Sequence, residues 1–120
     1  ALGKAILAAR PEEELDRLLA GYRWERRTPN TITSAEALRR ELELVRLRGY
    51  STDLEENEVG ARCVGVAICD RVGRPVGAIS ISGPSARLSE EAMAVMAARL
   101  KWAASEVRYR LGYGPLKGET

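Results

Sequence analysis

The stretch that most constrains the fold is RCVGVAICDRVGRPVGAISISG, residues 62–83, in which a polar turn joins two apolar runs. The first run, residues 63–69, is apolar on both faces, as is typical of a strand buried on both sides. The second run, residues 76–83, carries hydroxyls at Ser80 and Ser82, and their spacing of two puts both on one face. The pattern predicts a β-hairpin around which the rest of the chain is arranged.

Two lengths of the turn are compatible with its sequence, and they give different strand registers. A four-residue loop, residues 71–74, pairs Asp70 with Pro75. A three-residue loop that ends in a bulge at Gly73 shifts the register by one residue. We favour the four-residue loop.

The favoured register gathers small polar groups on one patch of the sheet. It places Cys63 opposite Ser82 and Gly65 opposite Ser80, with all four on the same face. A thiol, two hydroxyls and a bare glycine suit the floor of a small polar pocket, in which Gly65 leaves room for a ligand.

The composition bounds the class of protein. With 120 residues, 45% of them hydrophobic, the chain predicts one compact domain. A net charge of +2 is too close to balance to favour nucleic-acid or membrane binding, and no apolar run approaches the roughly 20 residues of a membrane span.

Cys63 and Cys69 lie six residues apart on one strand, which separates their Cα atoms by about 20 Å, so they cannot form a disulfide with each other. Two free cysteines fit the cytoplasm.

Helices are predicted before and after the hairpin. Residues 1–9 favour a helix, and Pro11 opens a second one that ends near Gly21. The run 33–36, TSAE, is a capping box for a third helix that Gly49 ends. A short strand at residues 50–52 and an acidic loop at 53–61 follow. Ser89 caps a last helix that ends at Gly112, and its predicted buried face consists of Met93, Met96, Ala97, Leu100, Ala104, Val107 and Leu111.

Catalytic and metal-binding patterns are missing from the sequence. The chain has no histidine, which excludes a serine or cysteine site that relies on histidine as its base. The two cysteines match no zinc pattern, the acidic loop lacks the spacing of a calcium loop, and the glycines form no nucleotide fingerprint. The arginines around Trp24 are interpreted as a surface loop. We therefore expect no enzyme activity, no metal and no cofactor.

Five segments in this order resemble one known family. They are TPNTIT at 28–33, RGYSTD at 48–53, EENE at 55–58, DRVGR at 70–74 and SISGP at 80–84. Together with ALGKA at 1–5 and Arg62-Cys63, they resemble the effector-binding domain of IclR-type bacterial transcription regulators. The resemblance covers residues 1 to about 112.

The resemblance implies an α+β fold, a GAF- or PAS-like antiparallel sheet flanked by helices. It implies that residues 1–112 are the C-terminal portion of the effector-binding domain. The residues after the last helix, 113–120, are expected from their position and composition to be a flexible tail. DNA would be bound only through an N-terminal winged helix-turn-helix that this chain lacks, as it lacks the first strands of the domain, so we expect a fragment of a longer protein. The family forms homodimers and homotetramers, and we expect no membrane association.

The resemblance also implies a set of effector-binding residues, and the effectors of the family are small organic or aromatic acids. The residues at the matching positions are Ala1, Leu2, Gly3, Asp53, Cys63, Ser80 and Ser82. Backbone N–H groups at the start of the first helix would favour a carboxylate. Asp53 is unfavourable beside an anion, so it would accept a hydrogen bond from an effector hydroxyl or carry a proton itself.

Two other readings remain open from the residues. The domain could be an oligomerisation module that binds no ligand. Alternatively, Cys63 beside Arg62 could be an activated thiolate that serves a redox sensor or a thiol enzyme. The other interpretation of Cys63 is that it is simply a small buried hydrophobic residue.

Overall fold

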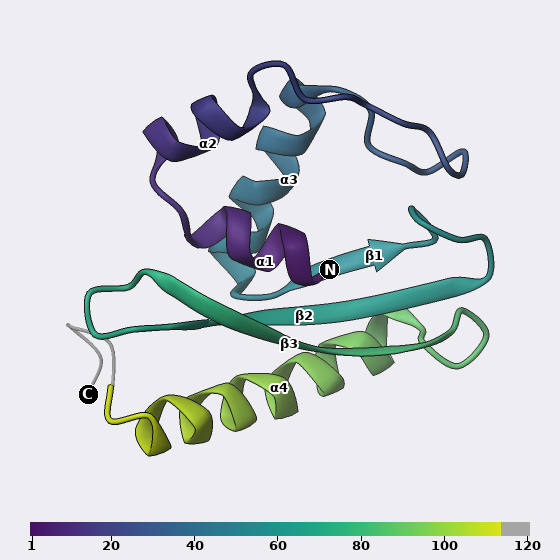
Figure 1. The fold of residues 1–120 in the computed structure, drawn as a ribbon. Coiled ribbons are helices and arrows are strands. Elements are labelled where there is room, and N and C mark those ends of the chain that lie inside the picture. The colour runs from purple at the N-terminus through teal and green to yellow at the C-terminus, as the bar shows by residue number, and fades with distance from the viewer. Residues whose placement is uncertain (114–120) are drawn as a thin grey trace.

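The structure, a computed structural model, describes residues 1–113. Within that part, helices precede and follow a three-stranded sheet (Figure 1). In chain order the elements are α1 (Leu2–Ala9), α2 (Glu12–Leu19), α3 (Ala35–Arg48), β1 (Ser51–Leu54), β2 (Ala61–Cys69), β3 (Pro75–Pro84) and α4 (Glu90–Arg110). Residues 114–120, to which most of the predicted tail belongs, lie outside the described part.

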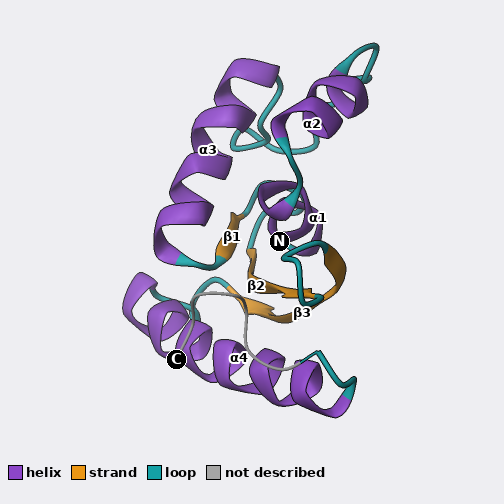
Figure 2. Cartoon of the chain, turned by 90° about the vertical axis from the view of Figure 1, so that its left-hand side faces the viewer, coloured by secondary structure: helices purple, strands orange, loops and turns teal. Residues whose placement is uncertain are grey.

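The sheet is antiparallel in the order β1-β2-β3 and lies between two helical layers. Helices α1, α2 and α3 form the layer on one side, and α4 runs along the other face (Figure 2). Both faces of β2 are therefore covered, as the apolar run at residues 63–69 predicted. The arrangement confirms the expected α+β class with helices on both faces.

The hairpin has the predicted register but not the predicted turn. Cys63 pairs with Ser82 and Gly65 with Ser80. At the turn, however, the Asp70 N–H donates to the Arg74 carbonyl at 2.8 Å, so the loop has three residues and ends at Gly73, with φ of 89°. A bulge next to Cys69, which pairs with Pro75, takes up the extra residue and restores the register along the strands.

Two separate hydrophobic cores stabilise the layered arrangement. One lies between the sheet and α4, and its fully buried members are Val64, Val66, Ile68, Leu88, Met93, Ala97, Leu100 and Ala104. The other lies within the helical layer and consists of Ala8, Leu15, Leu38, Leu42 and Val45, with Trp24 packed against it. The packing of Trp24 agrees with its interpretation as part of a surface loop.

Several local predictions need correction. The N-cap of α3 is Ser34 rather than Thr33, because the Ser34 hydroxyl accepts the N–H of Ala37 at 3.1 Å. The predicted buried face of α4 is wrong at its C-terminal end, where Val107 and Leu111 are exposed and Arg108 is buried. Arg108 takes this place because its Nε donates to the Cys69 carbonyl at 2.8 Å.

Candidate functional site

Three of the predicted site residues form one row across the sheet. Asp53 on β1 pairs with Cys63 on β2, which pairs with Ser82 on β3. The Ser82 hydroxyl donates to the Cys63 sulfur at 3.2 Å. The sequence predicts Asp53 in a loop, but it lies in β1, because that strand extends to Leu54. The row presents a carboxylate, a thiol and a hydroxyl on the face that α1 covers.

A second row lies beside it and positions the start of α1. Ser51, Gly65 and Ser80 are paired across the three strands. The buried Ser51 hydroxyl donates to the Ala1 carbonyl at 2.5 Å. A Cβ built on Gly65 would lie 3.1 Å from that same carbonyl. The predicted role of Gly65 is therefore wrong, because its free space holds the backbone at the start of α1 rather than a ligand.

The start of α1 places backbone donors at this edge of the site. Ala1 is the N-cap, and Leu2 and Gly3 are exposed. The first turn of a helix leaves its N–H groups without partners inside the helix, and these groups carry the positive end of the helix dipole. Because the backbone of Ala1 lies against Gly65, those donors lie at the end of the sheet that carries the polar side chains.

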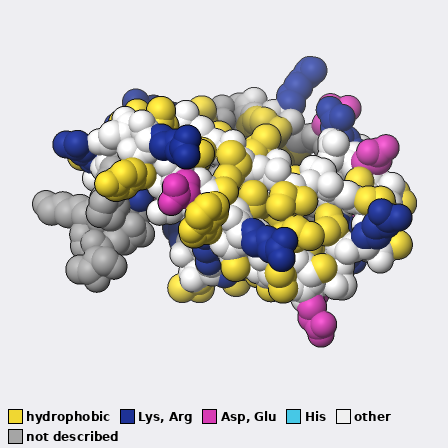
Figure 3. All heavy atoms as spheres, turned by 90° about the horizontal axis from the view of Figure 1, so that it is seen from below, with side chains coloured by type: hydrophobic (Ala, Val, Ile, Leu, Met, Phe, Trp, Pro, Cys, Tyr) yellow, Lys and Arg dark blue, Asp and Glu magenta, His cyan; other side chains and the backbone are white. Residues whose placement is uncertain are grey.

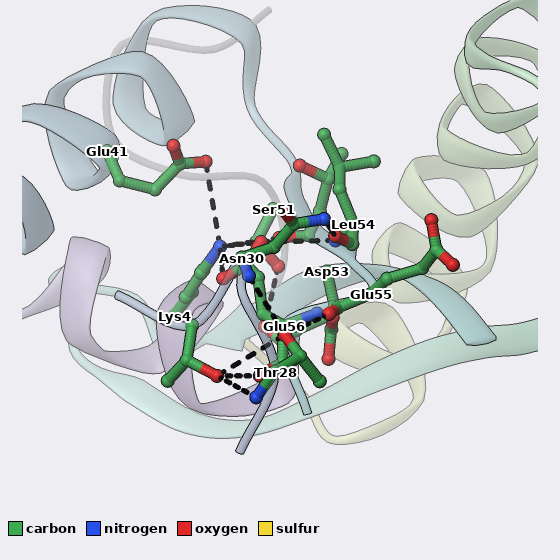
Figure 4. A network of polar contacts seen from close by, with 12 residues as sticks. Lys4, Thr28, Asn30, Glu41, Ser51, Asp53, Leu54, Glu55 and Glu56 are labelled. Carbon is green, nitrogen blue, oxygen red and sulfur yellow. Dashed lines mark hydrogen bonds and ion pairs between the residues drawn. The ribbon is translucent and has the colours of Figure 1, made fainter. Parts of the chain in front are cut away.

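An ion-paired network fixes α1 to the strand that carries Asp53 (Figure 4). The Lys4 ammonium lies 2.6 Å from the Glu56 carboxylate and donates to the Thr52 carbonyl at 2.7 Å. Glu41 on α3 lies 3.7 Å from the same ammonium. Because the Lys4 and Glu56 side chains are only 12% and 17% exposed, this pair is poorly screened by solvent.

Hydrogen bonds also hold Asp53 and the loop that follows it. One Asp53 oxygen accepts the Glu56 N–H at 2.8 Å. The loop is held from the other side by the segment before α3, where Asn30 Nδ2 donates to the Leu54 carbonyl at 2.9 Å and Thr28 donates to the Glu55 carbonyl (Figure 4). The TPNTIT and EENE segments therefore form one structural unit behind the site.

A cleft of about 440 Å³ opens beside this unit, between α1 and the α2–α3 connection. Its apolar wall includes Leu19, Trp24 and Leu38. Gly3 and Asp53 line it as well, whereas Cys63, Ser80 and Ser82 are not among its lining residues. Asp53 is thus the one predicted residue that belongs both to the row on the sheet and to the lining of this cleft.

The two cysteines are both free thiols, as predicted. Burial raises the pKa of the Cys69 thiol, an effect that the nearby Arg108 guanidinium opposes and Asp70 reinforces. Cys69 therefore stays protonated to higher pH in the folded chain than in the unfolded one. The thiol of the unfolded chain therefore loses its proton first, so Cys69 lowers the free energy of unfolding only as the pH rises above about 9.

Residues 1–113 contain no group of three or more histidine, cysteine or acidic side chains arranged to hold a metal ion. No helix in the same range is long and apolar enough to cross a membrane.

Ser51 and Lys4 are the residues that the sequence prediction missed. Ser51 could have been found, because it lies two residues before Asp53 and so shares its face of the strand. Lys4 had no such signal, since its partners come from residues about 50 positions away.

Comparisons with known proteins agree with this architecture. The family described as bacterial transcriptional regulator IclR, C-terminal, matches residues 1–109. The HTH-type transcriptional regulator KdgR of Escherichia coli is 42% identical over 113 residues, which are 94% of this chain and 43% of that protein. The chain thus spans less than half the length of this relative.

Solved structures show the same fold. The crystal structure of the Thermotoga maritima IclR matches with a TM-score of 0.88 and 48% identity, over 92% of this chain and 45% of that one. The inducer-binding domain of the PobR transcription factor from Acinetobacter, a double mutant in complex with 3-hydroxybenzoic acid, matches with a TM-score of 0.80 and 25% identity. That match covers 89% of this chain and 62% of that one.

Proposed function

Because this chain belongs to the IclR family of bacterial transcription regulators, we propose that it is the sensing part of such a regulator and binds a small organic or aromatic acid. The observation that carries the proposal is the row of Asp53, Cys63 and Ser82 next to the start of α1. The PobR inducer-binding domain, which shares the fold, forms a complex with 3-hydroxybenzoic acid, an aromatic hydroxy acid. A related use of this domain is therefore chemically reasonable.

In the proposed complex each group has a separate task. The backbone N–H groups of Leu2 and Gly3 bind the carboxylate of the acid, as helix N-termini bind anions. The hydroxyls of Ser80 and Ser82 and the Cys63 thiol donate or accept further hydrogen bonds. Asp53 accepts a hydrogen bond from a hydroxyl of the effector, which selects hydroxy acids over plain acids.

The whole regulator carries out the rest of the function. We propose that the chain is cytoplasmic and associates with further copies of itself as a homodimer or homotetramer. DNA is bound through a winged helix-turn-helix outside this chain. Binding of the acid shifts the populations of the assembly and so the spacing of its DNA-binding heads.

The test is the thermal stability of the chain against a panel of aliphatic, hydroxy and aromatic carboxylic acids. An acid present at 100 times its dissociation constant adds about 2.7 kcal/mol, which raises the melting temperature by several degrees. We expect the increase to shrink in Ser82→Ala and to persist in Ser105→Ala, a matched change on the exposed face of α4. An equal increase in both variants would contradict the assigned site, and no increase with any acid would favour a module that binds no ligand.

A further inference from the structure

The Asp53 carboxylate has one oxygen engaged within the chain and one that can accept a hydrogen bond from a ligand. Its Oδ1 accepts the Glu56 N–H at 2.8 Å, and no other group in residues 1–113 donates to this side chain. Oδ2 is therefore the atom that can accept the hydroxyl of a bound acid. Because the carboxylate is planar, the direction of Oδ2 depends on where the Glu56 N–H holds Oδ1.

The Glu56 N–H reaches back to Asp53 because the chain bends sharply at Glu55. Glu55 has φ of 59°, in the left-handed region that residues other than glycine seldom adopt. Such a conformation persists only where its surroundings enforce it. The Thr28 hydroxyl donates to the Glu55 carbonyl, and the Thr31 hydroxyl donates to the next carbonyl along the chain. The segment before α3 therefore holds the turn that directs this N–H at Asp53.

The Glu56 side chain fixes the same turn through its own carboxylate. Its Oε2 accepts the Leu54 N–H at 3.1 Å, and the Lys4 ammonium lies 2.6 Å from Oε1 and 2.8 Å from Oε2. Both oxygens therefore have donors, and the side chain cannot rotate without losing one of them. Lys4 lies on α1 directly after Gly3, whose N–H is proposed to bind the carboxylate of the acid. The ion pair thus joins the two groups that would bind the two ends of a hydroxy acid.

The surroundings of this ion pair differ from those of charges on the molecular surface. On the α4 side of the molecule, basic and acidic side chains stand apart from one another on the exposed face (Figure 3). Lys4 and Glu56 instead lie between α1 and the strand that carries Asp53, and their side chains are largely buried (Figure 4). Solvent screens such a pair poorly, so its geometry is held more strongly than that of an exposed pair.

We propose that Lys4 and Glu56 are positioning residues that set the distance between the N–H groups of α1 and Asp53 Oδ2, and so give the site its preference for hydroxy acids. The inference rests on the proposed function and deepens it. Lys4 acts through Glu56, and Glu56 acts through the N–H that it donates to Asp53. An acid whose hydroxyl lies at the matching distance gains a hydrogen bond to a charged group, which a plain acid does not.

The experiment is calorimetric titration of the chain with two matched pairs of acids, 3-hydroxybenzoic against benzoic acid and lactic against propionic acid. We expect Glu56→Gln to weaken binding of the hydroxy acid about tenfold and to change that of its plain partner less than about twofold. Glutamine has one acceptor oxygen, so its NH₂ group must face either the Lys4 ammonium or the Leu54 N–H, and the turn shifts. Glu36→Gln, the same change in the exposed pair with Arg40, should leave both affinities unchanged.

Two further variants separate positioning from folding, and melting temperatures verify that each variant is folded. Thr28→Val keeps the ion pair and removes the hydroxyl that holds the turn at Glu55, so the preference for the hydroxy acid should fall about threefold. In Asp53→Ala the preference should be absent. Adding Glu56→Gln to Asp53→Ala should then change nothing more, because the two residues act through one contact.

The other outcomes overturn either the inference or its premise. If Glu56→Gln weakens the binding of both acids of a pair equally, the ion pair only maintains the fold or binds the carboxylate, and the positioning role is wrong. Effects of Asp53→Ala and Glu56→Gln that add would also contradict it. A chain that binds acids without preference for the hydroxyl excludes the role of Asp53, and a chain that binds none of the acids overturns the proposed function together with the inference.

Discussion

Gly65→Val is expected to lower the free energy of unfolding by about 2 kcal/mol and to abolish the stabilisation by acids. Any Cβ at this position would lie 3.0 Å from the Ser51 hydroxyl and 3.1 Å from the Ala1 carbonyl. Backbone cannot give way as the end of a flexible side chain can, so the start of α1 must leave the sheet. The carboxylate-binding N–H groups would move with it.

Urea unfolding followed by circular dichroism measures the change, and Gly77→Val is the matched control. Gly77 lies on β3 with nothing within 4 Å of its built Cβ, so valine there costs no space and suits a strand. Equal losses of stability in the two variants would mean that the contact between Gly65 and α1 does not exist.

Lys4→Met is expected to destabilise the chain by about 3 kcal/mol. The methionine keeps most of the packing of the lysine stem, but the Glu56 carboxylate loses the ammonium that lies 2.6 Å away. That carboxylate is largely buried, and a buried charge without its partner is costly. The Thr52 carbonyl next to Asp53 loses its donor at the same time.

Arg40→Met is the matched control for this change. Arg40 pairs with Glu36 one turn away on α3, and both side chains are exposed to solvent. Exposed pairs of this kind contribute at most about 0.5 kcal/mol. If urea unfolding gives the two variants the same stability, the network that joins α1 to the acidic loop is not a significant part of the fold.

The regular parts of this fold could be predicted because local patterns determine them. Alternation along the strands placed Cys63 opposite Ser82 and Gly65 opposite Ser80, and a capping serine and a terminal glycine marked the ends of helices. The turn was mispredicted although the register was right, because a three-residue loop and a compensating bulge give the same pairing as a four-residue loop. The alternation of residue types predicts which residues pair along the strands, but it does not predict such a bulge.

The site was harder to predict than the sheet because its parts come from distant segments. The row of polar side chains follows from strand periodicity, but which backbone would lie over Gly65 does not. The free space of a glycine was therefore assigned to a ligand, when the carbonyl of Ala1 fills it. The contact between the segment at 28–33 and the acidic loop likewise depends on side chains that meet only after α3 has packed.

The measurement that tests the central claim most directly is a two-dimensional ¹⁵N–¹H NMR titration of the chain with the acid that raises its melting temperature most. The account predicts that the largest amide shifts fall on Leu2 and Gly3, which bind the carboxylate, and on Asp53, Cys63 and Ser82, which form the row on the sheet. Shifts confined to the cleft wall around Leu19, Trp24 and Leu38, with the row on the sheet unaffected, would contradict it.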